Sequence, residues 1–92
     1  MIGSRPIKNF SYTPHYERAH KRLPSHIKEF VKKREQWFRA NAFDTRLDTH
    51  KLKGQFSKFW SFSITRSYRI VFTFENGDEV VFHDAGDHRV YQ

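Results

Sequence analysis

The sequence predicts an α+β fold in which two N-terminal helices pack on one face of a small, twisted, mostly antiparallel sheet. Apolar residues recur at helical spacing in the first half of the chain and alternate with polar residues in the second half. The pair Asn76 and Gly77 separates the last two alternating segments and is a strong hairpin signal. The expected order of elements is β-α-α-β-β-β, in one domain that spans residues 1–92.

The first half of the chain is expected to contain a short strand and both helices. Residues 7–12 form a short mixed segment that is expected to be a strand. Thr13 and Pro14 mark a helix start, with threonine as the cap and proline at the first helical position. The first helix ends before Pro24, and the second is expected over residues 25–40. One stripe of this helix, at 3.6-residue spacing, consists of Ile27, Phe30, Val31, Arg34, Trp37 and Phe38.

Three closely spaced strands are expected over residues 59–65, 68–74 and 79–85. The turn between the first two contains either two or three residues, and a shift of one residue would turn a whole strand over. A three-residue turn at 65–67 is preferred, because it places the large apolar residues of both strands on one face. The helices can then cover that face.

The second hairpin decides which polar residues share the other face of the sheet. A two-residue turn at Asn76 and Gly77 places Arg69 opposite Asp84, so this carboxylate is expected to orient the guanidinium. The same register places His83 on the apolar face, where a structural role is expected. The residues expected to face a ligand are Ser61, Ser63, Arg69, Thr73 and Asp84.

The charge of the chain is distributed unevenly. Residues 1–69 contain sixteen basic and five acidic residues, a net charge of +11, whereas residues 70–92 contain one and five, a net charge of −4. A one-sided basic field attracts polyanions, so contact with nucleic acid or the ribosome is favoured. The absence of cysteine excludes disulfides and thiolate chemistry. No segment resembles a signal peptide or a membrane span, so a cytoplasmic location without membrane contact is expected.

Three local motifs stand in a fixed order along the chain: Leu-Lys-Gly at residues 52–54 before an aromatic strand, Tyr-Arg-Ile-Val-Phe at 68–72, and Gly-Asp-His-Arg-Val-Tyr at 86–91. These motifs resemble those of the RelE/ParE toxin superfamily. Together with the order of elements, the resemblance covers nearly the whole chain, and the last motif is most similar to YafQ-like members. It implies a type II toxin whose partner is an acidic or partly disordered antitoxin that wraps around it. Operator DNA would be contacted only through that complex.

The superfamily implies two different targets. RelE-type members cleave messenger RNA in the decoding site of the ribosome, whereas ParE-type members inhibit DNA gyrase and cleave nothing. The presence of matching residues favours the endoribonuclease, namely His50, Arg69, His88 and Tyr91. Ser61 and Ser63, which stand where RelE has lysines, favour the gyrase inhibitor. A third alternative is an inactive member that binds only its antitoxin and operator DNA.

Cleavage of RNA through its 2′-hydroxyl without a metal needs a base, an acid and positive groups that hold the phosphate. The resemblance assigns the phosphate to Arg69 and proton transfer to His50 and His88, with base and acid left open. Tyr91 would be a stacking or supporting group, and Asp84 would support Arg69. No acidic residues and histidines show the spacing of metal ligands, so neither a metal nor another cofactor is expected.

Basic residues outside this set are expected to contact RNA or the ribosome. Lys51 and Lys53 lie beside His50 in a long polar loop. The remaining members are Arg66 in the predicted turn and Lys32 and Lys33 on the second helix.

Overall fold

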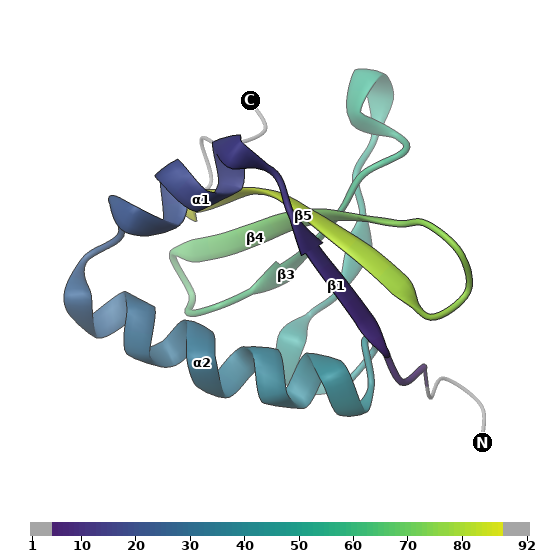
Figure 1. The fold of residues 1–92 in the computed structure, drawn as a ribbon, viewed down its shortest axis with the longest axis horizontal. Helices are drawn as coiled ribbons and strands as arrows, with labels where there is room; N and C mark the ends of the chain where they lie inside the picture. Colours follow the sequence, from purple (N-terminus) through teal and green to yellow (C-terminus); the bar gives the residue numbers. More distant parts are fainter. Residues whose placement is uncertain (1–4, 88–92) are drawn as a thin grey trace.

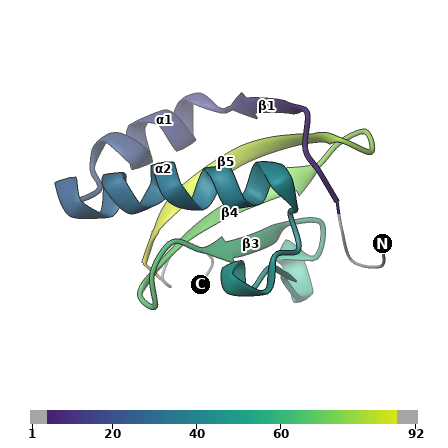
Figure 2. The ribbon, with the colours of Figure 1, turned by 90° about the horizontal axis from the view of Figure 1, so that it is seen from below.

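The computed structural model describes residues 5–87 and confirms the predicted α+β fold. The elements are β1 (Asn9–Tyr12), α1 (Pro14–Lys21), α2 (Ser25–Ala40), η1 (Thr45–Leu47), β2 (His50–Lys51), η2 (Gly54–Phe56), β3 (Trp60–Ser63), β4 (Tyr68–Phe74) and β5 (Glu79–Asp87), where η denotes a 3₁₀ helix. The sheet has the strand order β1-β5-β4-β3-β2. Only the β1–β5 pair is parallel, and both helices cover one face (Figures 1 and 2).

Local signals in the sequence account for both helices. The Thr13 side chain accepts a hydrogen bond from the Tyr16 amide at 3.0 Å, and Pro14 is the first helical residue, as predicted. Helix α2 has the predicted bounds. Phe30, a member of the predicted stripe, is 40% exposed, and the Arg34 guanidinium lies 5.1 Å from its ring centroid. No helix within residues 5–87 is long and apolar enough to cross a membrane.

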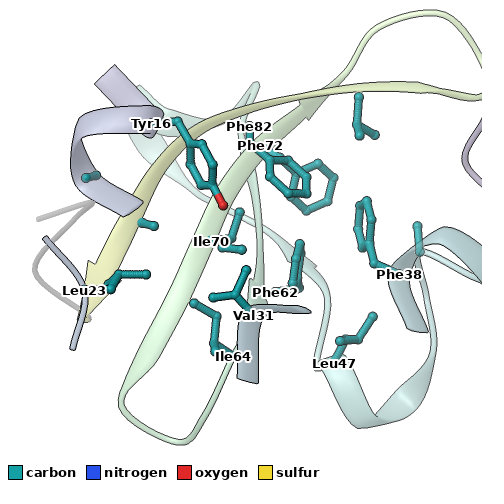
Figure 3. Packing of buried hydrophobic residues seen from close by; sticks show 14 of the residues in the cluster. Tyr16, Leu23, Val31, Phe38, Leu47, Phe62, Ile64, Ile70, Phe72 and Phe82 are labelled. Carbon is teal, nitrogen blue, oxygen red and sulfur yellow. The ribbon is translucent and has the colours of Figure 1, made fainter. Parts of the chain in front are cut away.

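An aromatic cluster forms the centre of the core between α2 and the sheet (Figure 3). Phe38 of α2 has no exposed surface. Its ring stacks on Phe62 of β3 with centroids 4.6 Å apart and meets Phe72 of β4 edge-on at 4.9 Å. Phe82 of β5 lies 5.9 Å away. A few large rings therefore supply much of the buried area that so short a chain needs.

The first hairpin has the predicted three-residue turn. The Ile64 amide donates to the Tyr68 carbonyl at 2.8 Å, so residues 65–67 form the turn. Phe62 pairs with Ile70 in the β3–β4 register. The apolar residues of both strands consequently lie on the helix-covered face, as expected.

The second hairpin differs from the prediction. The Glu75 amide donates to the Glu79 carbonyl at 2.9 Å, so the turn contains three residues, 76–78, and Gly77 has a positive φ of 38°. The register shifts again farther along, because Phe72 pairs with Phe82 but Val71 pairs with Asp84. Such an irregularity turns the side chains beyond it.

These two shifts change the neighbours of the candidate residues. Arg69 lies opposite Gly86, so its predicted pairing with Asp84 is wrong. Val80 is buried, whereas Val81 is only partly buried. His83 is the residue skipped in the pairing of β5 with β4, and the prediction that it joins the apolar face is also wrong.

Tyr16 offers a test of the packing between α1 and the sheet. Its side chain points from α1 into the core (Figure 3), and its hydroxyl has no hydrogen-bond partner among residues 5–87. Burial raises the pKa of this phenol, and a buried hydroxyl without a partner is destabilising. We expect Tyr16→Phe to leave the free energy of unfolding unchanged or to increase it by about 1 kcal/mol. Urea titration at pH 7 measures the free energy of unfolding. A decrease of more than about 1 kcal/mol in Tyr16→Phe would show that the hydroxyl has a hydrogen-bond partner in solution.

Candidate functional site

Arg69 and His50 lie on the polar side of the sheet, and each contacts a serine of β3. The Arg69 guanidinium donates from Nη1 to Ser63 Oγ at 3.0 Å. Ser61 Oγ lies 3.5 Å from His50 Nε2. The two serines are two residues apart on one strand, so their hydroxyls lie on the same face roughly 7 Å apart. Two serine hydroxyls of β3 therefore contact the two candidate residues, one each.

The hydrogen bonds of His50 define which of its nitrogens is basic. Nδ1 lies 2.9 Å from the carbonyl oxygen of Asp48, and a carbonyl can only accept. Nδ1 therefore carries the hydrogen, and in the neutral ring the lone pair is on Nε2, the atom near Ser61. This tautomer suits a group that takes a proton.

Asp48, and not Asp84, is the acidic neighbour of Arg69. Its Oδ2 lies 3.9 Å from Arg69 Nη1, and its backbone is in the left-handed region at a φ of 50°. Asp84 instead lies 3.1 Å from Nε2 of His15 on α1. The predicted support of Arg69 by Asp84 is replaced by a contact from the loop before β2, which no sequence pattern indicated.

A groove next to Arg69 gathers arginine side chains from three parts of the chain. Arg34 of α2, which the helical spacing placed on the same stripe as Trp37, lies over the Trp37 ring at 4.4 Å and donates to the Ile64 carbonyl at 2.9 Å. Arg46 lies over the same indole at 3.8 Å. The charged residues that line the groove are Arg34, Arg46, Asp48, Arg66 and Arg69. Like charges so gathered repel one another, so the groove favours an anionic ligand.

Asp44 holds Arg46 in this groove and provides a test by pH. Its carboxylate accepts from the Arg46 side chain at 2.7 and 3.0 Å, and these hydrogen bonds lower the pKa of Asp44 to about 2. The folded state therefore binds fewer protons than the unfolded state between about pH 4 and 2. The free energy that the Asp44–Arg46 pair contributes to folding is therefore present at neutral pH and is lost on acidification.

We expect Asp44→Asn to reduce the free energy of unfolding at pH 7 by at most about 1 kcal/mol, since solvent screens a surface pair. Asparagine keeps an oxygen that can cap η1, where Asp44 Oδ1 accepts from the Arg46 amide at 2.9 Å. Urea titrations of both proteins should differ at pH 7 and converge near pH 2. A difference that persists unchanged at pH 2 would contradict the role of the charge.

His83 also lies on the polar side of the sheet. The Thr73 hydroxyl donates to Glu75 at 2.7 Å, so at 2.9 Å it accepts from Nε2 of His83. Burial lowers the pKa of His83, an effect that Glu75 opposes and Lys58 reinforces. Ser61 and Thr73 are themselves buried, so the expectation that they face a ligand is wrong. Ser61 contacts His50 and Thr73 contacts His83 instead.

The remaining predicted site residues fall into three groups. Lys51 and Lys53 are exposed beside His50. Lys32 and Lys33 are exposed on α2, which packs on the other face of the sheet from Arg69. The predicted residues His88 and Tyr91 lie outside the described residues. Within residues 5–87, no three histidine or acidic side chains are grouped so that they could hold a metal ion.

Solved structures define the class of fold to which this arrangement belongs. A scan against protein-family models finds no match, and no curated protein matches the sequence significantly. The chain is similar in structure to the YoeB/ParE toxin from Agrobacterium tumefaciens, with a TM-score of 0.72 and 18% identity over 88% of this chain and 99% of that one. The chain therefore has the fold of the RelE/ParE toxins.

Two further structures carry the same fold. YafQ from E. coli strain BL21(DE3) matches with a TM-score of 0.74 and 9% identity over 89% of this chain and 94% of that one. A chain of the RelB-RelE antitoxin-toxin complex from Methanococcus jannaschii matches with a TM-score of 0.67 and 22% identity, over 86% and 91% of the two chains. At such low identities, the likeness establishes the shared fold and leaves the chemistry to be argued from the side chains of this protein.

Proposed function

We propose that this protein is the toxin of a type II toxin–antitoxin pair and cleaves messenger RNA on the ribosome. The observation that carries the proposal is the placement of His50 and Arg69 against Ser61 and Ser63 on one polar face. The fold, shared with proteins named as RelE, YafQ and YoeB/ParE toxins, supports the same class of function.

The chemistry is an in-line attack of the RNA 2′-hydroxyl on the adjacent phosphorus. Nε2 of His50 accepts the hydroxyl proton as the new O–P bond forms. Arg69 binds the non-bridging oxygens, whose negative charge grows in the transition state. The 5′-oxygen leaves with a proton from an acid, for which we propose His88, and Tyr91 stacks on a base. The products are a 2′,3′-cyclic phosphate and a 5′-hydroxyl, and no metal or cofactor enters the reaction.

The proposed partners follow from charge. Lys51, Lys53 and Arg66 would contact phosphates of the message or the ribosome. The antitoxin would be acidic or partly disordered and would fold on this basic surface, as a counterpart of RelB in the complex from Methanococcus jannaschii. Operator DNA would be reached only through the complex, and the site of action would be the cytoplasm.

Purified protein, programmed ribosomes and a defined message test the proposal. We expect cleavage within the decoding site that depends on the ribosome, with a 2′,3′-cyclic phosphate on the upstream fragment. An Arg69→Ala preparation purified in parallel excludes a contaminating nuclease. Folded protein that leaves the message intact would overturn the proposal and favour the ParE-like alternative. Ser61 and Ser63, which stand where RelE has lysines, also favour that alternative. Inhibition of supercoiling by DNA gyrase would then identify that alternative.

A further inference from the structure

A second pocket lies beside His50, in the segment that leads from β2 into η2. It has a volume of about 330 Å³, at the lower end of the range for small-molecule sites, and its lining residues are His50, Lys51, Leu52, Lys53 and Phe56. The proposed cleavage of RNA uses the histidine and both lysines, but it gives no role to the aromatic ring or to the pocket.

The local chain path creates this pocket. The Leu52 amide donates to the Phe59 carbonyl at 2.9 Å, which continues the β2–β3 pairing by one residue. Gly54 then adopts a φ of 67°, a conformation that other residues rarely take, and the chain turns into η2. This short turn projects beyond the sheet (Figure 1). Phe56, in the turn, lines the same pocket as Leu52.

The pocket combines an apolar floor with a cationic rim. Leu52 is buried and Phe56 is partly exposed, whereas Lys51 and Lys53 are exposed to solvent. Among the described residues, no acidic side chain lines it. An aromatic surface flanked by lysines binds a flat, apolar group that carries negative charge beside it, which is the chemistry of a nucleotide in single-stranded nucleic acid.

The pocket lies next to the proposed catalytic residues. His50 lines this pocket, and Asp48 and Arg69 line the arginine groove. The two are joined directly, because His50 Nδ1 bonds to the Asp48 carbonyl. An RNA strand bound in both would therefore lie next to His50 and Arg69.

We propose that the pocket formed by Leu52 and Phe56 binds one nucleobase of the RNA strand, stacked on the Phe56 ring, next to the bond that is cleaved. The inference rests on the proposed function for the role of His50, but the binding site itself does not. Stacking of one base on an aromatic side chain strengthens binding by about 5- to 100-fold, so this pocket sets both affinity and base preference.

Binding is tested by NMR titration of the isotopically labelled protein with adenosine 5′-monophosphate and, separately, with inorganic phosphate. We expect the nucleotide to shift the Phe56 ring and Leu52 methyl signals, and phosphate to leave both in place. Phe56→Leu should weaken nucleotide binding at least fivefold, whereas Phe56→Tyr should retain it. Tyr12→Leu, which alters another exposed aromatic residue on β1, is the matched control. Equal shifts from phosphate, or no shift at Phe56, would overturn the inference.

Cleavage on programmed ribosomes separates this inference from the proposed function. With messages that differ at each nucleotide around the cut, Phe56→Leu should flatten the base preference of the wild type. If the wild type cleaves and Phe56→Leu retains both rate and preference, the pocket is not a base site although the nuclease is real. If the wild type does not cleave yet the nucleotide shifts Phe56, the nucleotide site stands and the proposed reaction fails.

Discussion

Arg69→Ala is expected to lower the rate of messenger RNA cleavage on the ribosome by about 10²- to 10³-fold. The Arg69 side chain is only 20% exposed, and its guanidinium donates to Ser63 at 3.0 Å. A pre-oriented cation in a partly desolvated position stabilises growing phosphate charge more than a mobile surface cation does. Single-turnover cleavage of a message in programmed ribosomes measures the effect.

Two variants separate the geometry of Arg69 from its charge. Arg69→Lys keeps the charge but loses two-point contact with the phosphate, so we expect a rate between those of the wild type and Arg69→Ala. Arg39→Ala removes an equal charge from α2, where the guanidinium covers the Phe10 ring at 4.1 Å, and should cleave within a few-fold of the wild type. Near-normal cleavage by a folded Arg69→Ala protein would remove Arg69 from the reaction.

Phe38→Ala should have the largest effect on stability and lower the free energy of unfolding by about 3–5 kcal/mol. The ring has no exposed surface and packs against Phe62, Phe72 and Phe82 at once. Its removal leaves a cavity between α2 and the sheet that the strands cannot close without losing their register. A chain of this size has a total stability of roughly 5–14 kcal/mol, so much of the margin would disappear.

Urea titration and thermal unfolding of Phe38→Ala measure this loss. Phe30→Ala is the matched control, because the same change is made on the same helix at a ring that is 40% exposed. We expect it to cost less than about 1 kcal/mol. Comparable losses from the two variants would mean that the Phe38 ring does not pack between α2 and the sheet.

The local elements of the fold were predictable because their signals lie within a few residues of one another. The Thr13 cap with Pro14, the bounds of α2 and the three-residue turn at 65–67 were all predicted and are all observed. The two-residue strand β2 was not predicted, because a pair of residues carries no periodicity. His50 was selected by resemblance alone, before anything indicated that it joins the sheet.

The candidate site depends far more on distant contacts. Arg34 and Arg46 lie twelve residues apart and meet over Trp37 only because η1 folds back on α2. The spacing of Asp44 and Arg46 is a local signal of this site, since an aspartate two residues before an arginine can cap a turn and pair with the arginine. Phe56 offered no signal at all.

The sequence by itself determined the fold class, the helices, the first hairpin and the basic character of the surface, since each follows from composition or from spacing along one segment. Only the tertiary structure decided the register of β5, and with it the replacement of Asp84 by Asp48 beside Arg69 and the move of His83 to the polar face. The reason is physical: alternation along a strand is the same in every register, so a shift of one residue changes every partner while leaving the pattern intact. Packing of β5 between β1 and β4 selects among those registers.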